Sequence, residues 1–301
     1  MPATSRRIVR LSLIVTVLAI VLASLGSQHS SSRRSTTTTV DLYGLRGHPS
    51  ANQQREAAAA YRAYRTYVVA AAQAFSSDAA SMCSAGLAHD LVRARQSWRR
   101  AQMDYDRLRS RIADRSNTEL TIDGLIANQP FYVGRNGLHA IEQDLFGSTG
   151  PQLADDCRHI AGDGVALTFG LSHTVATPSR IALDTVSLLT WMVERVIAQP
   201  QEVFAHTQST DSDSVVHSVA SWWSFERPLV VLVDARIIPL VDHAVTVLLI
   251  DQSRVGGPGT PDSQVSDASW SHLAHDAVHV ATLMTRVASE LYGFGAGRTY
   301  A

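Results

Sequence analysis

The sequence contains no lysine: all 26 of its basic residues are arginine, in a chain of 301 residues. A chain without lysine cannot form a lysine Schiff base and cannot supply the lysine of a phosphate-binding loop. Glycine-rich phosphate loops and dinucleotide fingerprints are missing as well. The sequence therefore gives no support to nucleotide chemistry.

Outside the N-terminus, acidic residues outnumber basic ones. Residues 1–45 hold five arginines and one aspartate, which leaves 21 basic and 26 acidic residues in the rest of the chain. Nucleic-acid-binding domains carry an excess of basic residues, so we expect no nucleic-acid partner. A mildly acidic body suits cations better.

The N-terminus resembles an export signal. Arg6, Arg7 and Arg10 precede the largely apolar run Leu11–Leu25, which predicts a signal peptide or an uncleaved signal anchor within residues 1–28. The Ser/Thr-rich residues 29–50 predict a disordered tether. We expect an exported protein, periplasmic or at the cell surface, which is anchored in the membrane through residues 11–26 if that segment is not cleaved.

Cysteine occurs only twice, at positions 83 and 157. In an oxidising compartment these two residues favour a disulfide that closes a long loop, and two buried free thiols are the alternative.

Strand-like alternation of apolar and polar residues is absent, and apolar residues recur at three- and four-residue steps instead. The fold class predicted is all-α, an antiparallel helical bundle or two packed bundles, in one domain over residues 51–295. One apolar stripe runs unbroken from Leu87 to Ile112, and Pro228 and Pro239 are expected to kink or break the helical stretch 212–250. The other expected helices cover 61–75, 131–146, 152–174, 178–200 and 270–291.

The segment Gly137–Phe146 carries the best candidate for chemistry. His139 and Glu142 lie three residues apart, so a helix places the imidazole and the carboxylate side by side. A nitrogen donor next to a carboxylate suits iron, zinc or manganese. The alternative is a half-buried histidine in an ordinary helix, since two ligands do not complete a site.

This segment resembles the Gly-x-His-x-x-Glu signature of the imelysin-like family, which includes the EfeO/EfeM-type iron-uptake proteins. Further segments resemble that family in the same order along residues 55–292. They are Tyr61–Val69, Ala94–Leu108, Thr121–Asp123, Val193–Val196, Trp222–Phe225 and Ile238–Leu240.

The resemblance implies two packed four-helix-type bundles with a metal site in the cleft between them. It implicates His139 and Glu142 as metal ligands, with Asp106, Asp123 and Glu194 as supporting acids. Each acid has an ordinary alternative: Asp106 could pair with Arg107 or Arg109, Asp123 could cap a helix, and Glu194 could flank the core.

The chain also departs from the family pattern. Arg109 stands where a second acid often follows three residues after Asp106, and an arginine there could occupy the space of a ligand. The copper-binding β-domain and the lipoprotein cysteine of some relatives are missing, so the resemblance is to the helical domain alone.

The leading hypothesis is an extracytoplasmic iron-binding protein that hands its ion to a membrane permease, with zinc or another divalent metal as the alternative ion. This function needs no catalytic residue. The rivals are an imelysin-type metallopeptidase, although the zincin His-Glu-x-x-His pattern is absent, and a surface scaffold whose metal site has decayed.

Three further histidines, His272, His275 and His279, fall on one face of the last helix, opposite its apolar stripe. A solvated polar face is favoured there, with a weak surface metal site as the alternative. Trp222 and Trp223 are expected to pack in the core.

Overall fold

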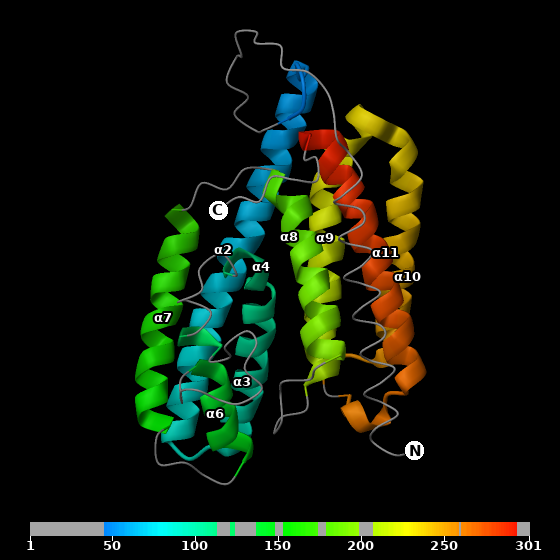
Figure 1. Cartoon of the computed structure of the whole chain (residues 1–301). Coiled ribbons are helices and arrows are strands. Elements are labelled where there is room, and N and C mark those ends of the chain that lie inside the picture. The colour runs from blue at the N-terminus through cyan, green and yellow to red at the C-terminus, as the bar shows by residue number, and fades with distance from the viewer. Residues whose placement is uncertain are drawn as a thin grey trace.

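A computed structural model describes residues 45–112, 121–123, 137–147, 153–173, 179–198, 207–258 and 260–293 (Figure 1). Every regular element in these ranges is helical, and no strand occurs in them, which confirms the all-α prediction. Within the same ranges no helix combines the length and the apolarity needed to cross a membrane. The predicted signal segment and residues 29–44 of the predicted tether lie outside the described residues.

The longest helix, α2 (Ala51–Leu87), runs through the middle of the molecule (Figure 1). Ser50 opens it with a capping box, because the Ser50 side chain accepts from the Gln53 backbone while the Gln53 side chain accepts from the Ser50 backbone. One apolar face of α2, including Tyr64 and Phe75, is buried. The helix packs against α3, α7 and α9, so it links the two sides of the structure.

The stripe predicted to be unbroken from Leu87 to Ile112 is interrupted twice. Helix α2 ends at Leu87, where the side chain is 54% exposed, and α3 (Leu91–Asp106) begins after a left-handed residue, His89 (φ 60°). Asp90 caps α3 by accepting from the Arg93 backbone N–H. A short α4 (Arg109–Ile112) follows as a separate element. The apolar period continues across these breaks, which explains why the single-helix prediction was wrong.

The next two helices are α6 (Gly137–Phe146) and α7 (Leu153–His173). Cys83 of α2 and Cys157 of α7 form a disulfide with a Cα–Cα distance of 5.4 Å. The favoured reading of the two cysteines is therefore confirmed.

The described residues of the second half form long helices and short π-helical or 3₁₀ segments. These are α8 (Ser179–Trp191), the π-helical η1 (Met192–Ile197), α9 (Gln208–Asp234), the 3₁₀ turn η2 (Ala235–Ile237), α10 (Ile238–Val255), η3 (Asp262–Gln264) and α11 (Asp267–Tyr292). Pro239 lies in the first turn of α10, as the predicted break requires. Pro228 lies inside α9 without ending it, so of the predicted kink or break the break does not occur, and the kink stays a prediction.

Helices α2, α3, α6 and α7 lie on one side of the molecule and α8 to α11 on the other (Figure 1). Because α2 packs against α9 as well as α7, one core continues through both groups. Trp222 illustrates this continuity, since its buried ring packs edge-on against Tyr64 and Tyr67 of α2. A division into two bundles with a cleft between them stays a prediction.

Candidate metal centre

Two side chains of α3 hold helix α6 in place. The Trp98 indole N–H donates to the Leu138 carbonyl at 2.8 Å, and the Arg95 Nε–H donates to the Leu145 carbonyl at 2.7 Å. The Trp98 ring also meets the Phe146 ring edge-on, with the centroids 5.3 Å apart. Because the side-chain donors bind both ends of α6, its inward face has a fixed orientation.

Gly137 lets α6 begin directly against the turn at residues 121–123. Its backbone is left-handed (φ 81°), and a Cβ at this position would lie 2.3 Å from the Ile122 carbonyl oxygen. Two residues later, the His139 backbone N–H faces the Asp123 carbonyl oxygen at 3.4 Å. The close approach that only glycine permits therefore brings His139 and Asp123 together.

Gly137→Ala is expected to lower the free energy of unfolding by at least about 2 kcal/mol, because the new methyl group meets rigid backbone in a left-handed conformation. Urea unfolding of the purified protein measures the loss. The control is Gly162→Ala in α7, where a Cβ meets no atom within 4 Å, and a gain of about 0.5–1 kcal/mol is expected. Equal effects at both positions would refute this role of Gly137.

His139 lies between two carboxylates from different segments. Its Nδ1 is 3.0 Å from Glu142 Oε2, one helical turn away, and its Nε2 is 3.5 Å from Asp123 Oδ1. All three side chains are at least 95% buried. The predicted pairing of His139 with Glu142 on one helix face is therefore observed, and Asp123 joins the pair from the preceding turn.

Arg109 binds both aspartates of this centre. Its two terminal nitrogens are 2.6 Å and 3.1 Å from the two Asp123 carboxylate oxygens, and one of them is also 3.2 Å from Asp106 Oδ1. Gln102 donates a further hydrogen bond to Asp106 Oδ1 at 3.3 Å. The two-pronged contact with Asp123 is the strong form of an arginine–carboxylate pair.

Aromatic rings cover the same guanidinium. Arg109 Cζ lies 4.0 Å from the Trp191 ring centroid and 4.9 Å from the Tyr105 ring centroid. Such cation–π contacts strengthen where water is excluded, and Arg109 is 3% exposed.

The buried charges stabilise one another. Burial disfavours the ionised form of Asp123, but the Arg109 guanidinium and the His139 hydrogen bond outweigh it and hold the pKa of Asp123 well below its usual range. Burial likewise opposes the charge of Arg109, and Asp123 and Asp106 raise the Arg109 pKa well above its ordinary value. Arg109 and Asp123 are thus an ion pair throughout the neutral range.

Four of the five predicted ligands meet in this centre: Asp106, Asp123, His139 and Glu142. Glu194 lies in η1 and is half-buried, and no hydrogen bond or ion pair joins it to the other four among the described residues. No three His, Cys, Asp or Glu side chains of the described ranges are placed so that they could hold one metal ion as they stand. Glu142 and Asp123 lie against different ring nitrogens of His139, and the Arg109 guanidinium lies against Asp123 and Asp106.

The three histidines of α11 do not form a second centre. His272, His275 and His279 are exposed, as the solvated-face reading predicts.

A second buried polar cluster was not predicted from the sequence. Glu226 of α9 is fully buried and accepts a hydrogen bond from the Tyr292 hydroxyl of α11 at 3.1 Å. Burial raises the pKa of Glu226 to about 8, against the hydrogen bonds from Tyr292 and the Ala182 backbone, and the nearby Asp184 adds to the rise. Glu226 is therefore largely protonated at neutral pH.

Asp184 of α8 belongs to the same cluster but is held differently. Its Oδ2 accepts from the Tyr64 hydroxyl at 2.5 Å and lies 3.3 Å from an Arg111 nitrogen. The sequence signal for this cluster is an acid among apolar neighbours in each of two helices, which is too common a pattern to identify it.

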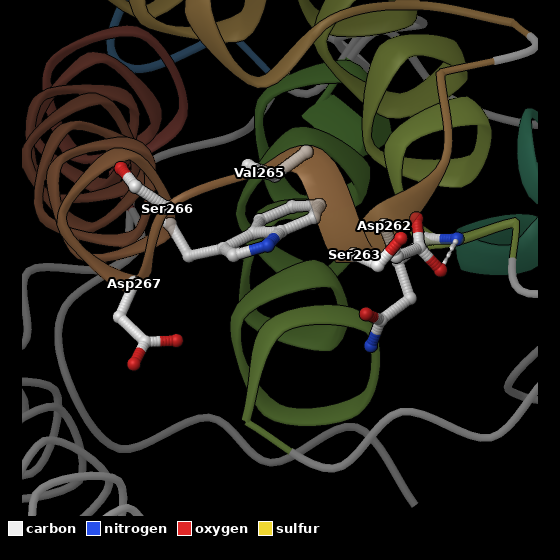
Figure 2. Close-up of a pocket in the computed structure, with 7 residues that line it drawn as sticks. Asp262, Ser263, Val265, Ser266 and Asp267 are labelled. Atoms are coloured by element: carbon white, nitrogen blue, oxygen red, sulfur yellow. Dashed lines mark hydrogen bonds between the residues drawn. The ribbon is translucent and has the colours of Figure 1, made fainter. Parts of the chain in front are cut away.

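A pocket of about 370 Å³ lies elsewhere, beside the first turns of α9 and α11 (Figure 2). It is lined by Gln208, Asp262, Ser263, Val265, Ser266, Asp267 and Trp270. The Asp262 carboxylate already accepts from the Gln208 and Ser209 backbone N–H groups at 3.4 Å and 3.2 Å. None of the predicted ligands lines this pocket.

The sequence model of the imelysin family (peptidase family M75) matches residues 60–221, which is more than half of the chain. The matched part runs from within α2 to the middle of α9 and contains all five predicted ligands. No curated protein matches the chain.

Proposed function

The chain belongs to the imelysin family, and on that premise we propose that it is an extracytoplasmic protein that captures a metal ion, with iron as its cargo. The ion would be held by His139 and Glu142, with Asp123 and Asp106 as supporting acids. Glu194, half-buried in η1, is proposed as a further supporting acid.

The observation that carries the proposal is the meeting of these four side chains in one buried place. They come from α3, from the turn at 121–123 and from α6. Burying three carboxylates costs free energy, and a stable helical fold does not need them in its core. Such a cluster therefore indicates a function that uses its charge.

The donor set fits iron and other first-row divalent metals. Carboxylate oxygens suit hard ions, and one imidazole nitrogen favours iron, zinc or manganese over calcium and magnesium. Each donor binds the ion in its deprotonated form, so acid pH should release it. Iron capture of this kind requires no chemical turnover.

The disulfide and the family membership are consistent with an extracytoplasmic location. We propose a periplasmic or cell-surface site of action, with residues 11–26 as the export signal or membrane anchor. The partner proposed there is a membrane iron permease that receives the ion.

Titration calorimetry of Fe(II), Fe(III) and Zn(II) into residues 46–301 tests the proposal. Saturable binding is expected for the unaltered protein, and its loss is expected in the double variant His139→Ala/Glu142→Ala. The control is His272→Ala/His275→Ala, which removes two exposed histidines of α11 and should leave the binding unchanged.

Binding that is lost in the α11 variant instead would place the metal on the surface and contradict the proposed centre. Hydrolysis of a denatured protein by the metal-loaded chain, stopped by chelation, would favour the metallopeptidase alternative.

One observation favours a second candidate, a surface scaffold in which Arg109 has replaced the metal. The guanidinium already pairs with both Asp123 and Asp106 without any ion. This candidate predicts no metal after purification and the same melting temperature with and without a chelator.

A further inference from the structure

We propose that Arg109 is a displaceable internal cation, and that a metal ion enters the centre by exchange with its guanidinium. The inference rests on the proposed function and names the residue that regulates the affinity of the same site. It concerns this chain in particular, because it follows from an arginine in the place of an acid.

The contacts of Arg109 are those that an entering ion needs. Both carboxylate oxygens of Asp123 and one of Asp106 lie 2.6–3.2 Å from its terminal nitrogens. Asp123 Oδ1 is also the atom nearest to His139 Nε2, at 3.5 Å. An ion that joined His139 to Asp123 would therefore have to take the Asp123 oxygens from the guanidinium.

Trp191 offers a place where the displaced charge can remain. The guanidinium carbon lies 4.0 Å from the Trp191 ring centroid, in a contact that does not depend on the aspartates. Trp191 ends α8 and leads into the π-helical η1. Arg109 can thus lose its carboxylates and keep an aromatic partner, which lowers the cost of exchange.

The exchange gives Arg109 a defined effect on affinity. While the guanidinium holds Asp123 and Asp106, an ion must compete with a charge that is already paired and buried. The arginine therefore weakens binding, and its return to the aspartates favours release. Weakened binding of this kind suits a protein that passes its ion on.

The test compares Arg109→Met with the unaltered protein in titrations with Fe(II), under anaerobic conditions, and with Zn(II). Affinity is expected to rise by roughly tenfold or more, since a unit charge next to the ligands is removed. The matched control is Arg111→Met, which alters the other arginine of α4 that pairs with a buried carboxylate. Arg111 contacts Asp184 and not the centre, so the affinity should stay as it is.

The outcomes separate this inference from the proposed function. Tighter binding in Arg109→Met, abolished by adding His139→Ala/Glu142→Ala, supports both. Equal or weaker binding in Arg109→Met, with saturable binding in the unaltered protein, overturns the inference alone. Binding confined to Arg109→Met supports the inference and overturns native metal capture, and binding in neither protein overturns both.

Arg109→Lys keeps the inference testable if the methionine variant does not fold. Lysine retains the charge but cannot hold both oxygens of Asp123 with a planar fork. The expected affinity lies between those of the unaltered protein and a charge-free variant, and an affinity at or below that of the unaltered protein overturns the inference. Added Zn(II) should also raise the melting temperature of Arg109→Lys more than that of the unaltered protein.

Discussion

Glu226→Gln is expected to raise the free energy of unfolding by about 5 kcal/mol at pH 9 and to change it little at pH 4. Glutamine keeps the shape of the protonated side chain and still accepts the Tyr292 hydrogen bond. It removes the carboxylate that the buried position cannot accommodate.

The sign follows from the two pKa values of Glu226. Unfolded, it titrates near 4.5, and folded, near 8, because burial disfavours the ion. Between these values the folded state holds a proton that the unfolded state has lost, so raising the pH favours unfolding. The destabilisation caused by burying Glu226 is close to zero below about pH 4.5, increases up to about pH 8, and is constant above that.

Urea unfolding at a series of pH values measures this profile. The unaltered protein should lose stability from pH 5 to pH 8 relative to Glu226→Gln. Glu290→Gln, at an exposed position of α11, is the control and should follow the unaltered protein throughout. Parallel pH profiles for Glu226→Gln and the unaltered protein would show that Glu226 ionises normally in the folded state.

Loss of the Cys83–Cys157 disulfide is the second large effect, with an expected cost of about 4 kcal/mol. The bond closes a loop of 74 residues in sequence separation and ties α2 to α7. Without the bond the unfolded chain gains conformational freedom. In the folded protein both cysteines lie in the buried core.

Urea unfolding with and without reductant provides the measurement for the unaltered protein. The double variant Cys83→Ala/Cys157→Ala is the control, since its stability should be low and unaffected by reductant. If full reduction, verified by thiol titration, left the stability of the unaltered protein unchanged, the bond would have no role in holding α7 in place.

Helix positions follow closely from the sequence, whereas helix ends do not. The three- and four-residue apolar period depends on local geometry alone, so it predicted the buried faces around Tyr64, Trp98 and Leu273. It could not show the break at His89, because the apolar stripe continues across it. Pro228 was expected to kink or break its helical stretch, and α9 continues through it.

The candidate site was predictable where its residues are close in sequence. His139 and Glu142 share a helical turn. Arg109 and Asp106 are also three residues apart, and this spacing allows their ion pair. The two-pronged contact of Arg109 with Asp123 was not predictable, because it depends on how the turn at 121–123 packs against α4. Glu226 and Tyr292 lie 66 residues apart, and only the tertiary fold brings them together.

Metal capture by the His139/Glu142 centre is tested most directly by anomalous diffraction from crystals grown with iron, recorded on both sides of the iron absorption edge. Metal capture predicts one anomalous peak within bonding distance of His139 and Glu142, with Arg109 moved away from Asp123. A peak on the exposed histidines of α11 would contradict metal capture by this centre. Crystals with no anomalous peak and an unchanged Arg109–Asp123 pair would contradict it as well.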